Sequence, residues 1–375
     1  MKNFTIIFRV TNSCNLNCKY CYDKQNHMNM REENERFSLK MSSFVDNISR
    51  LWNDKNAKSE IIFHGGEPLI INADNYDRLM AKIKEIYPNA KFSMQTNATL
   101  LNEKNIKILK KYNVHIGISI DGFDEQTNHC RVYKNGKNSF DKVMQNIKLL
   151  KDNNVSFGII MTLTNSAKGK EQEFYKFISE NDLKCNIRPA FQCNQSNVDF
   201  MTNNDYFEFF QKIFDIWIKD ENKTIKLTQI REIYDEFAKA LQPNYRNKSC
   251  SVSGNCFKNF ISLDTMGNLY SCNRTYNNPE FFYGNISEME IEQLEKKINE
   301  RIRERQQYLE KSKCKKCKIY DECKGGCPAN SYSLHGRRDS VDDSFCTAKM
   351  KIKDYINEYL NENEKRKDYE EMRKK

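Results

Sequence analysis

Six short apolar segments recur along the first 235 residues, and each has the length and composition of a β-strand. Each of these segments is short and rich in isoleucine, valine or phenylalanine. We predict strands at residues 4–10, 60–63, 91–95, 114–120, 155–163 and 184–188.

Amphipathic stretches separate these apolar segments. At residues 41–52, 76–87 and 140–150, apolar side chains recur with the i, i+3, i+4, i+7 spacing of one helix face. A strand followed by a helix, repeated six times, predicts an α/β fold with a parallel sheet and helices packed outside it. The pattern fits an open doubly wound sheet or an incomplete barrel, and it leaves the strand order open.

The sequence changes character after about residue 240. A turn signal at 264–268 between two apolar runs, 260–263 and 269–271, predicts a β-hairpin. A charged amphipathic helix at about 288–311, a cysteine-rich segment at 314–346 and a final helix from about Thr347 follow. We predict three parts: 1–235 as the βα unit, 236–347 as a second, metal-organised domain, and 348–375 as a helical tail.

Charge and hydropathy narrow the function classes. The 375 residues carry 61 Lys and Arg against 51 Asp and Glu, a formal net charge of +10, but the two signs are interleaved, so we expect no nucleic-acid partner. No apolar run approaches the roughly 18 residues of a transmembrane helix, and no signal peptide is evident. We therefore expect a cytoplasmic chain without a membrane partner. In that reducing compartment, 14 cysteines favour metal ligation over disulfides.

Three cysteines, Cys14, Cys18 and Cys21, follow the first predicted strand. Thiolates from one loop can converge on one metal centre, but a tetrahedral zinc site needs a fourth ligand, and the segment from Cys14 to Cys21 contains no His and no fourth Cys. A four-iron cluster can instead leave one iron open to a substrate. Parallel βα folds build their sites at the C-terminal ends of strands, which is where this loop lies.

The second predicted strand ends in the sequence His64-Gly65-Gly66-Glu67-Pro68. Paired glycines let a ligand approach the backbone, and the Glu67 carboxylate can bind an ammonium group. Taken alone, this motif fits a turn as well as a binding site.

Together, the cysteine loop and the Gly-Gly motif resemble the radical S-adenosylmethionine (SAM) superfamily. The CxxxCxxC spacing is similar to the signature that holds the family's catalytic 4Fe-4S cluster, and Gly65 to Pro68 is similar to its motif for the methionine amine. The resemblance implies a (β/α)6 partial TIM barrel over about the first 235 residues. It also implies reductive cleavage of SAM to a 5′-deoxyadenosyl radical, with an electron donor such as flavodoxin or ferredoxin.

The same resemblance implies which residues contact SAM. Tyr20 resembles the aromatic residue beside the adenine, and Arg131 is a candidate for the SAM carboxylate or for a structural ion pair. The full set of cofactor-binding residues that we expect is Tyr20, Gly65, Gly66, Glu67, Asn97, Ser119 and Arg131.

Eight further cysteines lie beyond residue 240. Their Cys-x2-Cys and Cys-x3-Cys spacings would suit two zinc sites, and a zinc-binding interaction module is one interpretation. Their layout also resembles a SPASM domain, which houses two auxiliary 4Fe-4S clusters. The resemblance implies one cluster on Cys250, Cys256, Cys272 and Cys327, and another on Cys314, Cys317, Cys323 and Cys346.

Radical SAM enzymes with SPASM domains mostly modify ribosomally made peptides or proteins, so the resemblance implies a precursor peptide or protein as substrate. Anaerobic sulfatase-maturating enzymes, which oxidise Cys or Ser to formylglycine, share this length and cysteine layout. They carry an Asp, proposed as a base, where this chain has Asn273, which cannot accept a proton at neutral pH. We therefore rank peptide crosslinking or a similar modification first and sulfatase maturation as the alternative. No catalytic residue is identifiable.

Three cysteines remain outside these sets: Cys130, Cys185 and Cys193. We expect each of them to be a small buried hydrophobic residue.

Overall fold

The structure is a computed structural model of the chain, and it describes residues 4–23, 29–190, 198–220, 229–241, 245 and 256–361. The first strands and helices are β1 (Thr5–Thr11), α1 (Met30–Leu39), α2 (Met41–Leu51), β2 (Glu60–Gly65), α3 (Ala73–Ile86), β3 (Lys91–Thr96), α4 (Glu103–Lys111) and β4 (His115–Ser119). They are followed by α5 (Phe140–Asp152), β5 (Phe157–Leu163), α6 (Glu171–Glu180), β6 (Cys185–Pro189), α7 (Asn203–Lys219) and α8 (Arg231–Leu241).

The remaining elements form the second half of the molecule. They are α9 (Cys256–Asn259), β7 (Phe260–Asp264), β8 (Asn268–Tyr270), β9 (Phe282–Asn285), α10 (Ile291–Lys311), α11 (Tyr320–Cys323), α12 (Pro328–His335) and α13 (Cys346–Asn361). Short 3-10 helices lie at Pro68–Ile70, Asn165–Ala167, Asn273–Thr275, Pro279–Phe281 and Lys313–Lys316. Within the described ranges, no helix combines the length and the apolar run needed to cross a bilayer.

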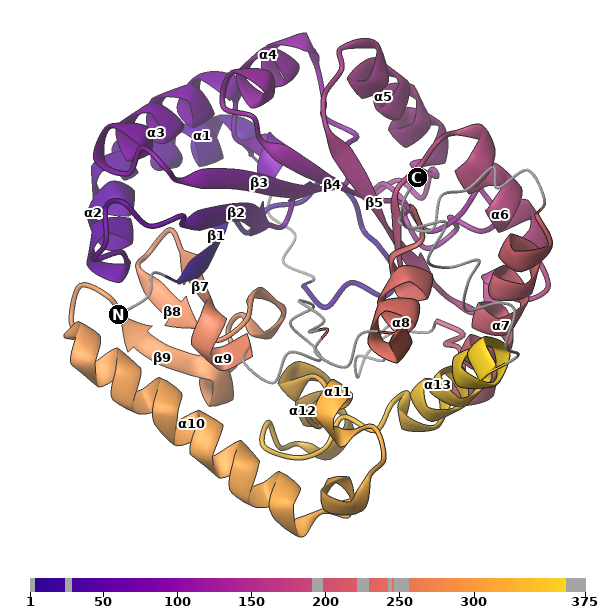
Figure 1. The fold of residues 1–375 in the computed structure, drawn as a ribbon. Helices are drawn as coiled ribbons and strands as arrows, with labels where there is room; N and C mark the ends of the chain where they lie inside the picture. Colours follow the sequence, from indigo (N-terminus) through magenta and orange to yellow (C-terminus); the bar gives the residue numbers. More distant parts are fainter. Residues whose placement is uncertain are drawn as a thin grey trace.

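All six predicted strands of the first part are present, and their order decides between an open doubly wound sheet and an incomplete barrel. The sheet runs in the order β6-β5-β4-β3-β2-β1-β7-β8-β9, so β1 to β6 follow the chain without reversal. A doubly wound sheet reverses its order at a switch point, whereas unreversed right-handed crossovers place every helix on one face. The strands accordingly curve around the inside of a ring with α2 to α7 outside it, which is the arrangement of an incomplete barrel (Figure 1).

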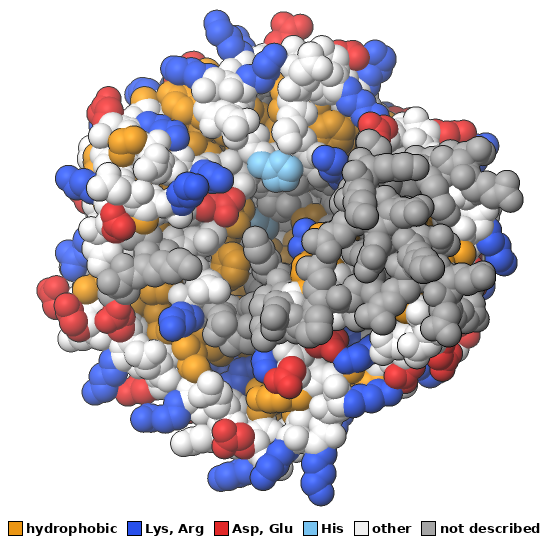
Figure 2. Space-filling view, viewed as in Figure 1, with side chains coloured by type: hydrophobic (Ala, Val, Ile, Leu, Met, Phe, Trp, Pro, Cys, Tyr) orange, Lys and Arg blue, Asp and Glu red, His pale blue; other side chains and the backbone are white. Residues whose placement is uncertain are grey.

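Side chains alternate across this curved sheet. On β2, Ile61 and Phe63 are fully buried in the core beneath the helices, while Ile62 and His64 on the opposite face are partly exposed. The same alternation on the next strands places polar, partly exposed side chains on the inner face: His64, Gln95, Ser119, Thr162 and Arg188. The molecular surface is hollowed near the centre of the face drawn in Figure 2.

Element boundaries differ from the predictions where local hydrogen bonds decide them. The strand predicted from residue 155 begins at Phe157, because the Val155 amide still closes the end of α5 on the Leu150 carbonyl at 3.0 Å. The helix predicted from residue 288 begins at Ile291, because Glu290 and Gln293 form a reciprocal capping box. The three predicted barrel helices, the hairpin and the final helix as far as Asn361 are confirmed, and residues 362–375 of the predicted tail lie outside the described residues.

The hairpin continues the barrel sheet, which the sequence pattern did not predict. β7 pairs in parallel with β1 from Thr5 opposite Phe260 to Arg9 opposite Asp264, and β8 and β9 extend the sheet in antiparallel fashion. The helix α13 also returns to the barrel, since the Tyr355 hydroxyl donates to Asp215 Oδ1 at 2.5 Å. The helices α10 to α13 thereby close the lower side of the ring (Figure 1).

One buried arginine organises the cysteine-rich segment. Arg305 on α10 is 7% exposed and donates to four backbone carbonyls, those of Gly325 (2.7 Å), Gly326 (3.0 Å), Arg338 (2.9 Å) and Ser340 (2.6 Å). A planar guanidinium can serve several acceptors at once, which a lysine cannot do in the same geometry. Arg305 therefore fixes the loop between Cys323 and Cys327 against α10.

Replacing Arg305 by Leu should destabilise the protein by about 3 kcal/mol, because four buried carbonyls lose their charged donor. Urea denaturation of the anaerobically purified chain measures this change. Arg303→Leu is the matched control, since Arg303 is exposed on the same helix and its loss should change the free energy of unfolding by less than about 0.5 kcal/mol. Equal effects of the two substitutions would contradict the role given to Arg305.

Candidate active site

The cysteine loop begins directly after β1 and is held in place by the segment that follows β4. The Asn17 amide donates to the Val132 carbonyl at 2.7 Å, and the Lys19 amide donates to the Cys130 carbonyl at 2.9 Å. Leu16 adds an antiparallel bridge to Tyr133. These backbone contacts present the loop at the C-terminal edge of the parallel strands.

The three thiols of this loop lie close enough to influence one another electrostatically. Burial raises the pKa of both Cys14 and Cys18 to about 12, and the neighbouring thiols contribute to the increase. All twelve cysteines of the described residues are free thiols. As they stand in that part of the chain, no three Cys, His, Asp or Glu side chains converge as a metal site.

A cationic centre fits this donor set. Buried thiols with raised pKa values stay protonated in the absence of a cation, and metal binding is what favours the thiolate form. Three thiols from a single loop are compatible with a cluster that keeps one position open.

Gly65 and Gly66 are required by close backbone packing against the start of the cysteine loop. Gly65 has a φ of +129°, and a Cβ atom there would lie 2.2 Å from the Thr11 carbonyl oxygen. A Cβ atom on Gly66 would lie 2.2 Å from the Ser13 carbonyl oxygen. The amides of Gly66 and Glu67 donate to those same carbonyls at 3.0 and 2.8 Å. Close approach to this chain's own backbone is therefore a physical reason for both glycines.

Glu67 is 1% exposed and joins the ends of β2 and β3. Its Oε1 accepts from the Leu69 amide at 2.9 Å and from the Thr96 hydroxyl at 2.5 Å, and its Oε2 accepts from the Asn97 amide at 2.8 Å. Burial raises the pKa of Glu67 to about 7, although these three hydrogen bonds oppose the shift.

Asn97 and Ser119 also lie at the strand ends. The Asn97 side chain donates to Asn15 Oδ1 at 2.9 Å and so contacts the cysteine loop. Ser119 accepts from Gln95 Nε2 at 3.0 Å on the inner face of the barrel. Both residues therefore border the region where the loops after β1 to β4 meet.

Arg131 forms the structural ion pair that the sequence analysis left open. Its Nε donates to Asp121 Oδ1 at 2.8 Å, while the Tyr20 hydroxyl donates to Asp121 Oδ2 at 2.5 Å. The guanidinium carbon lies 5.6 Å from the centre of the Tyr20 ring, and Nη1 lies 4.0 Å from Cys18 Sγ. Tyr20 and Arg131 are thus brought together beside the cysteine loop.

A polar cluster centred on Arg9, which is 1% exposed, was not predicted from the sequence. Arg9 forms an ion pair with Asp23 and donates to Asn12 Oδ1 at 2.5 Å and to Asn273 Oδ1 at 3.3 Å. Its guanidinium also stacks 4.0 Å from the centre of the Tyr276 ring. An arginine in the middle of an otherwise apolar strand was the available signal, because a buried charge needs partners.

The eight cysteines of the second half are only partly described. Cys314, Cys317, Cys323 and Cys346 line one small cavity together with Ile319 and Tyr320. Within the other predicted set, Arg274 follows Cys272 by two residues and donates toward Cys327 Sγ at 3.8 Å. Cys250 lies outside the described residues, so that set is incomplete here. Cys256 begins α9.

The structure describes two of the three cysteines that lie outside the predicted ligand sets. Cys130 is 1% exposed and Cys185 is 3% exposed, which confirms that both are buried in the interior. Cys193 lies outside the described residues.

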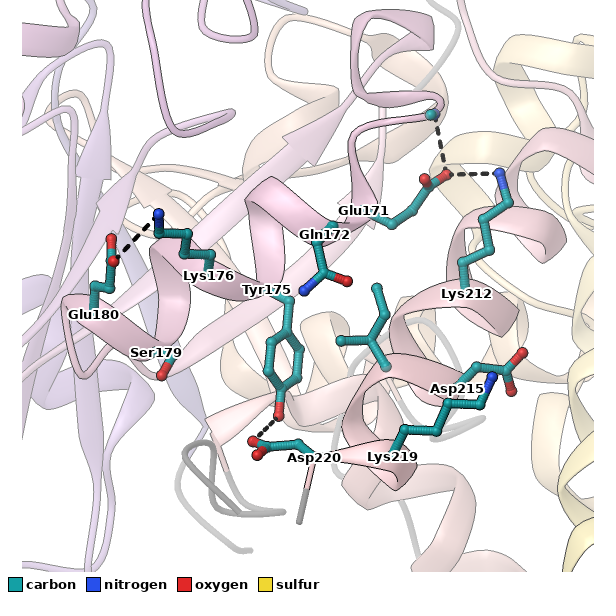
Figure 3. A pocket seen from close by; sticks show the side chains of 12 residues that line it. Glu171, Gln172, Tyr175, Lys176, Ser179, Glu180, Lys212, Asp215, Lys219 and Asp220 are labelled. Atoms are coloured by element: carbon teal, nitrogen blue, oxygen red, sulfur yellow. Dashed lines mark hydrogen bonds and ion pairs between the residues drawn. The ribbon is translucent and has the colours of Figure 1, made fainter. Parts of the chain in front are cut away.

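A second hollow, between α6 and α7, lies on the outside of the barrel and contains none of the cysteines. Several of its charges are paired: Glu171 lies 3.5 Å from Lys212, and Lys176 lies 3.7 Å from Glu180. The Tyr175 hydroxyl donates to Asp220 at 2.7 Å (Figure 3). Because this hollow has mixed and largely paired charges and contains no cysteine, the strand ends are the better candidate for the active site.

Known proteins share this combination of fold and motifs. Residues 8–178 match the Radical SAM superfamily. A cysteine-type anaerobic sulfatase-maturating enzyme of Clostridium novyi (strain NT) is 28% identical over 347 residues, covering 88% of this chain and 89% of that protein.

Solved structures give the same result. Native anSMEcpe with bound AdoMet has a TM-score of 0.77 at 25% identity and covers 95% of this chain and 98% of its own. The same enzyme with bound AdoMet and Kp18Cys peptide has a TM-score of 0.73 at 26% identity, with 95% and 97% covered. Residues 8–178 therefore form a radical SAM domain, and nearly the whole chain is similar in sequence and fold to anaerobic sulfatase-maturating enzymes.

Proposed function

We propose that this enzyme oxidises a Cys or Ser side chain of a peptide or protein substrate to formylglycine. The observation that carries the proposal is the likeness to sulfatase-maturating enzymes over nearly the whole chain, in sequence and in fold. Sequence analysis ranked peptide crosslinking first and sulfatase maturation second, and the relatives favour the reverse order.

The strand ends supply the residues that would hold SAM and its cluster. Cys14, Cys18 and Cys21 are the proposed cluster ligands. When bound, cluster and SAM would supply an organic radical that removes a hydrogen atom from the substrate.

Glu67 suits the recognition of an ammonium group. A carboxylate has about four lone-pair positions, and three hydrogen bonds from Leu69, Thr96 and Asn97 occupy three of them. One position is left for the amine of SAM, and the three fixed donors orient the carboxylate before the ligand arrives.

The second half of the molecule suits two auxiliary clusters in a SPASM domain. The cavity shared by Cys314, Cys317, Cys323 and Cys346 supports the second of the two predicted ligand sets. An external electron donor, flavodoxin or ferredoxin, belongs to the same proposal, because reductive cleavage consumes an electron.

A second candidate function is a peptide modification other than formylglycine formation. It is favoured by Asn273, which stands where sulfatase-maturating enzymes carry the Asp proposed as a base. An amide cannot accept the proton of a substrate thiol. A reaction that needs no such base would suit Asn273 better.

Anaerobic reconstitution should give about twelve iron atoms per chain, from three four-iron clusters. A variant with Cys14, Cys18 and Cys21 all changed to Ala should retain about eight and lose SAM cleavage, because only one cluster is removed. Metal analysis and 5′-deoxyadenosine formation measure the two effects. Cys130→Ala, at a buried cysteine outside the sets, is the control and should keep about twelve. Two tightly held zinc ions without iron would instead indicate a zinc-binding module.

Incubation with SAM, a strong reductant and the Kp18Cys peptide should convert the cysteine to formylglycine, detected by mass spectrometry. A serine version of the peptide tests whether the chain accepts both residue types. Reductive SAM cleavage without formylglycine from either peptide would favour the second candidate function. If another peptide lost two hydrogen atoms without forming an aldehyde, the second candidate function would be established.

A further inference from the structure

Asn273 lies between three polar side chains, each of which limits how its amide can be oriented. Arg9 Nη1 lies 3.3 Å from its Oδ1, while the Tyr22 hydroxyl lies 3.0 Å and His64 Nδ1 lies 3.1 Å from its Nδ2. Arginine can only donate, so Oδ1 must face Arg9 and the amino group must face the other two. Both N–H bonds of Asn273 are therefore used.

This orientation decides which nitrogen of His64 carries the proton. Nδ1 faces two donors, the Gly65 amide at 2.9 Å and the Asn273 amino group at 3.1 Å. The Gly65 carbonyl oxygen is also near Nδ1, at 3.3 Å, but both donors lie closer to Nδ1 than this acceptor does. Nδ1 is thus the acceptor, and a neutral His64 carries its hydrogen on Nε2.

His64 is neutral at physiological pH in this environment. Burial lowers its pKa to about 4, and the nearby Arg9 charge contributes to the decrease. With Nδ1 occupied and Nε2 protonated, the ring can donate one hydrogen bond and can accept no proton at Nε2.

The His64 side chain lies on the inner face of the barrel sheet. His64 is partly exposed, and it belongs to the inner-face row with Gln95 and Ser119. In the part of the chain that the structure describes, Nε2 has no hydrogen-bond partner. The donor is therefore available to a ligand in the barrel.

We propose that His64 is a hydrogen-bond donor to an oxygen of the peptide substrate, and that Asn273 is the positioning residue that fixes His64 as the Nε2–H tautomer. This assignment rests on the proposed function, because it takes the substrate to be a peptide. It specifies the partner as an acceptor group, such as a backbone carbonyl or carboxylate. It also excludes His64 and Asn273 as acceptors of a substrate thiol proton.

An Asp at position 273 would not fit the same arrangement. Its carboxylate can only accept, so it would draw a proton onto Nδ1 of His64, opposite the Gly65 amide. Asn273 and His64 are therefore complementary, one as double donor and the other as acceptor.

The tautomer can be measured directly in the anaerobically purified holoprotein labelled with ¹⁵N-histidine. The His64 signals, identified by their absence in His64→Gln, should show an unprotonated Nδ1 and a protonated Nε2. Asn273→Asp should shift the proton to Nδ1 or give the doubly protonated ring. Asn102→Asp, which makes the same charge change at an exposed helix N-cap, should leave His64 unchanged. A protonated Nδ1 in the wild-type protein would overturn the proposal.

The contact with substrate is tested by binding of fluorescently labelled Kp18Cys peptide in the presence of SAM. His64→Leu should weaken binding about tenfold, whereas His64→Gln, whose amide both accepts and donates, should stay within about threefold. His115→Leu, at the opposite end of the barrel, is the control and should bind as the wild type does. Wild-type binding by His64→Leu would overturn the assignment of His64. Absence of peptide binding by the wild-type protein together with absence of SAM cleavage would count against the proposed function itself.

Discussion

The buried guanidinium of Arg9 is the constraint on which the candidate site depends. A charge inside a strand must be paired, and its partners come from the cysteine loop after β1 and from the segment after β8. Arg9 donates a hydrogen bond to Asn273, which lies 264 positions later in the sequence, so the pairing of this one charge joins distant segments. The barrel and the second half of the chain are thereby placed relative to each other at the point where SAM and substrate are proposed to meet.

Hydrophobic periodicity predicted the six barrel strands, because each strand buries one face and the pattern is local. Most boundaries shifted by a few residues, and at Val155 and Glu290 local hydrogen bonds account for the shift. The parallel pairing of β7 with β1 was not predictable in this way, since nothing in either apolar run encodes its partner. The same holds for the partners of Arg9: a charge in an apolar strand signals that partners exist, but the sequence does not show that they are Asp23 and Asn273.

The candidate ligands were found by spacing and by resemblance, and the structure adds physical reasons for only some of them. Gly65 and Gly66 have a packing requirement that spacing could not reveal, and Arg131 is held by Asp121. The cavity lined by Cys314, Cys317, Cys323 and Cys346 brings together a set that spans 33 positions of sequence. The roles given to His64 and Asn273 follow from which of their atoms donate and which accept hydrogen bonds, and the residue types alone do not show this.

The pairing of β7 with β1 has a consequence for how the chain can be divided. A fragment ending near residue 235 would contain the whole radical SAM match, yet it would leave the outer edge of β1 with unpaired amides and carbonyls. Exposed edges of this kind recruit strands from other molecules, so such a fragment would tend to aggregate. It would also expose the guanidinium of Arg9 on the side where Asn273 and Tyr276 now cover it. The second half of the chain thus covers the edge of the barrel sheet that would otherwise be open.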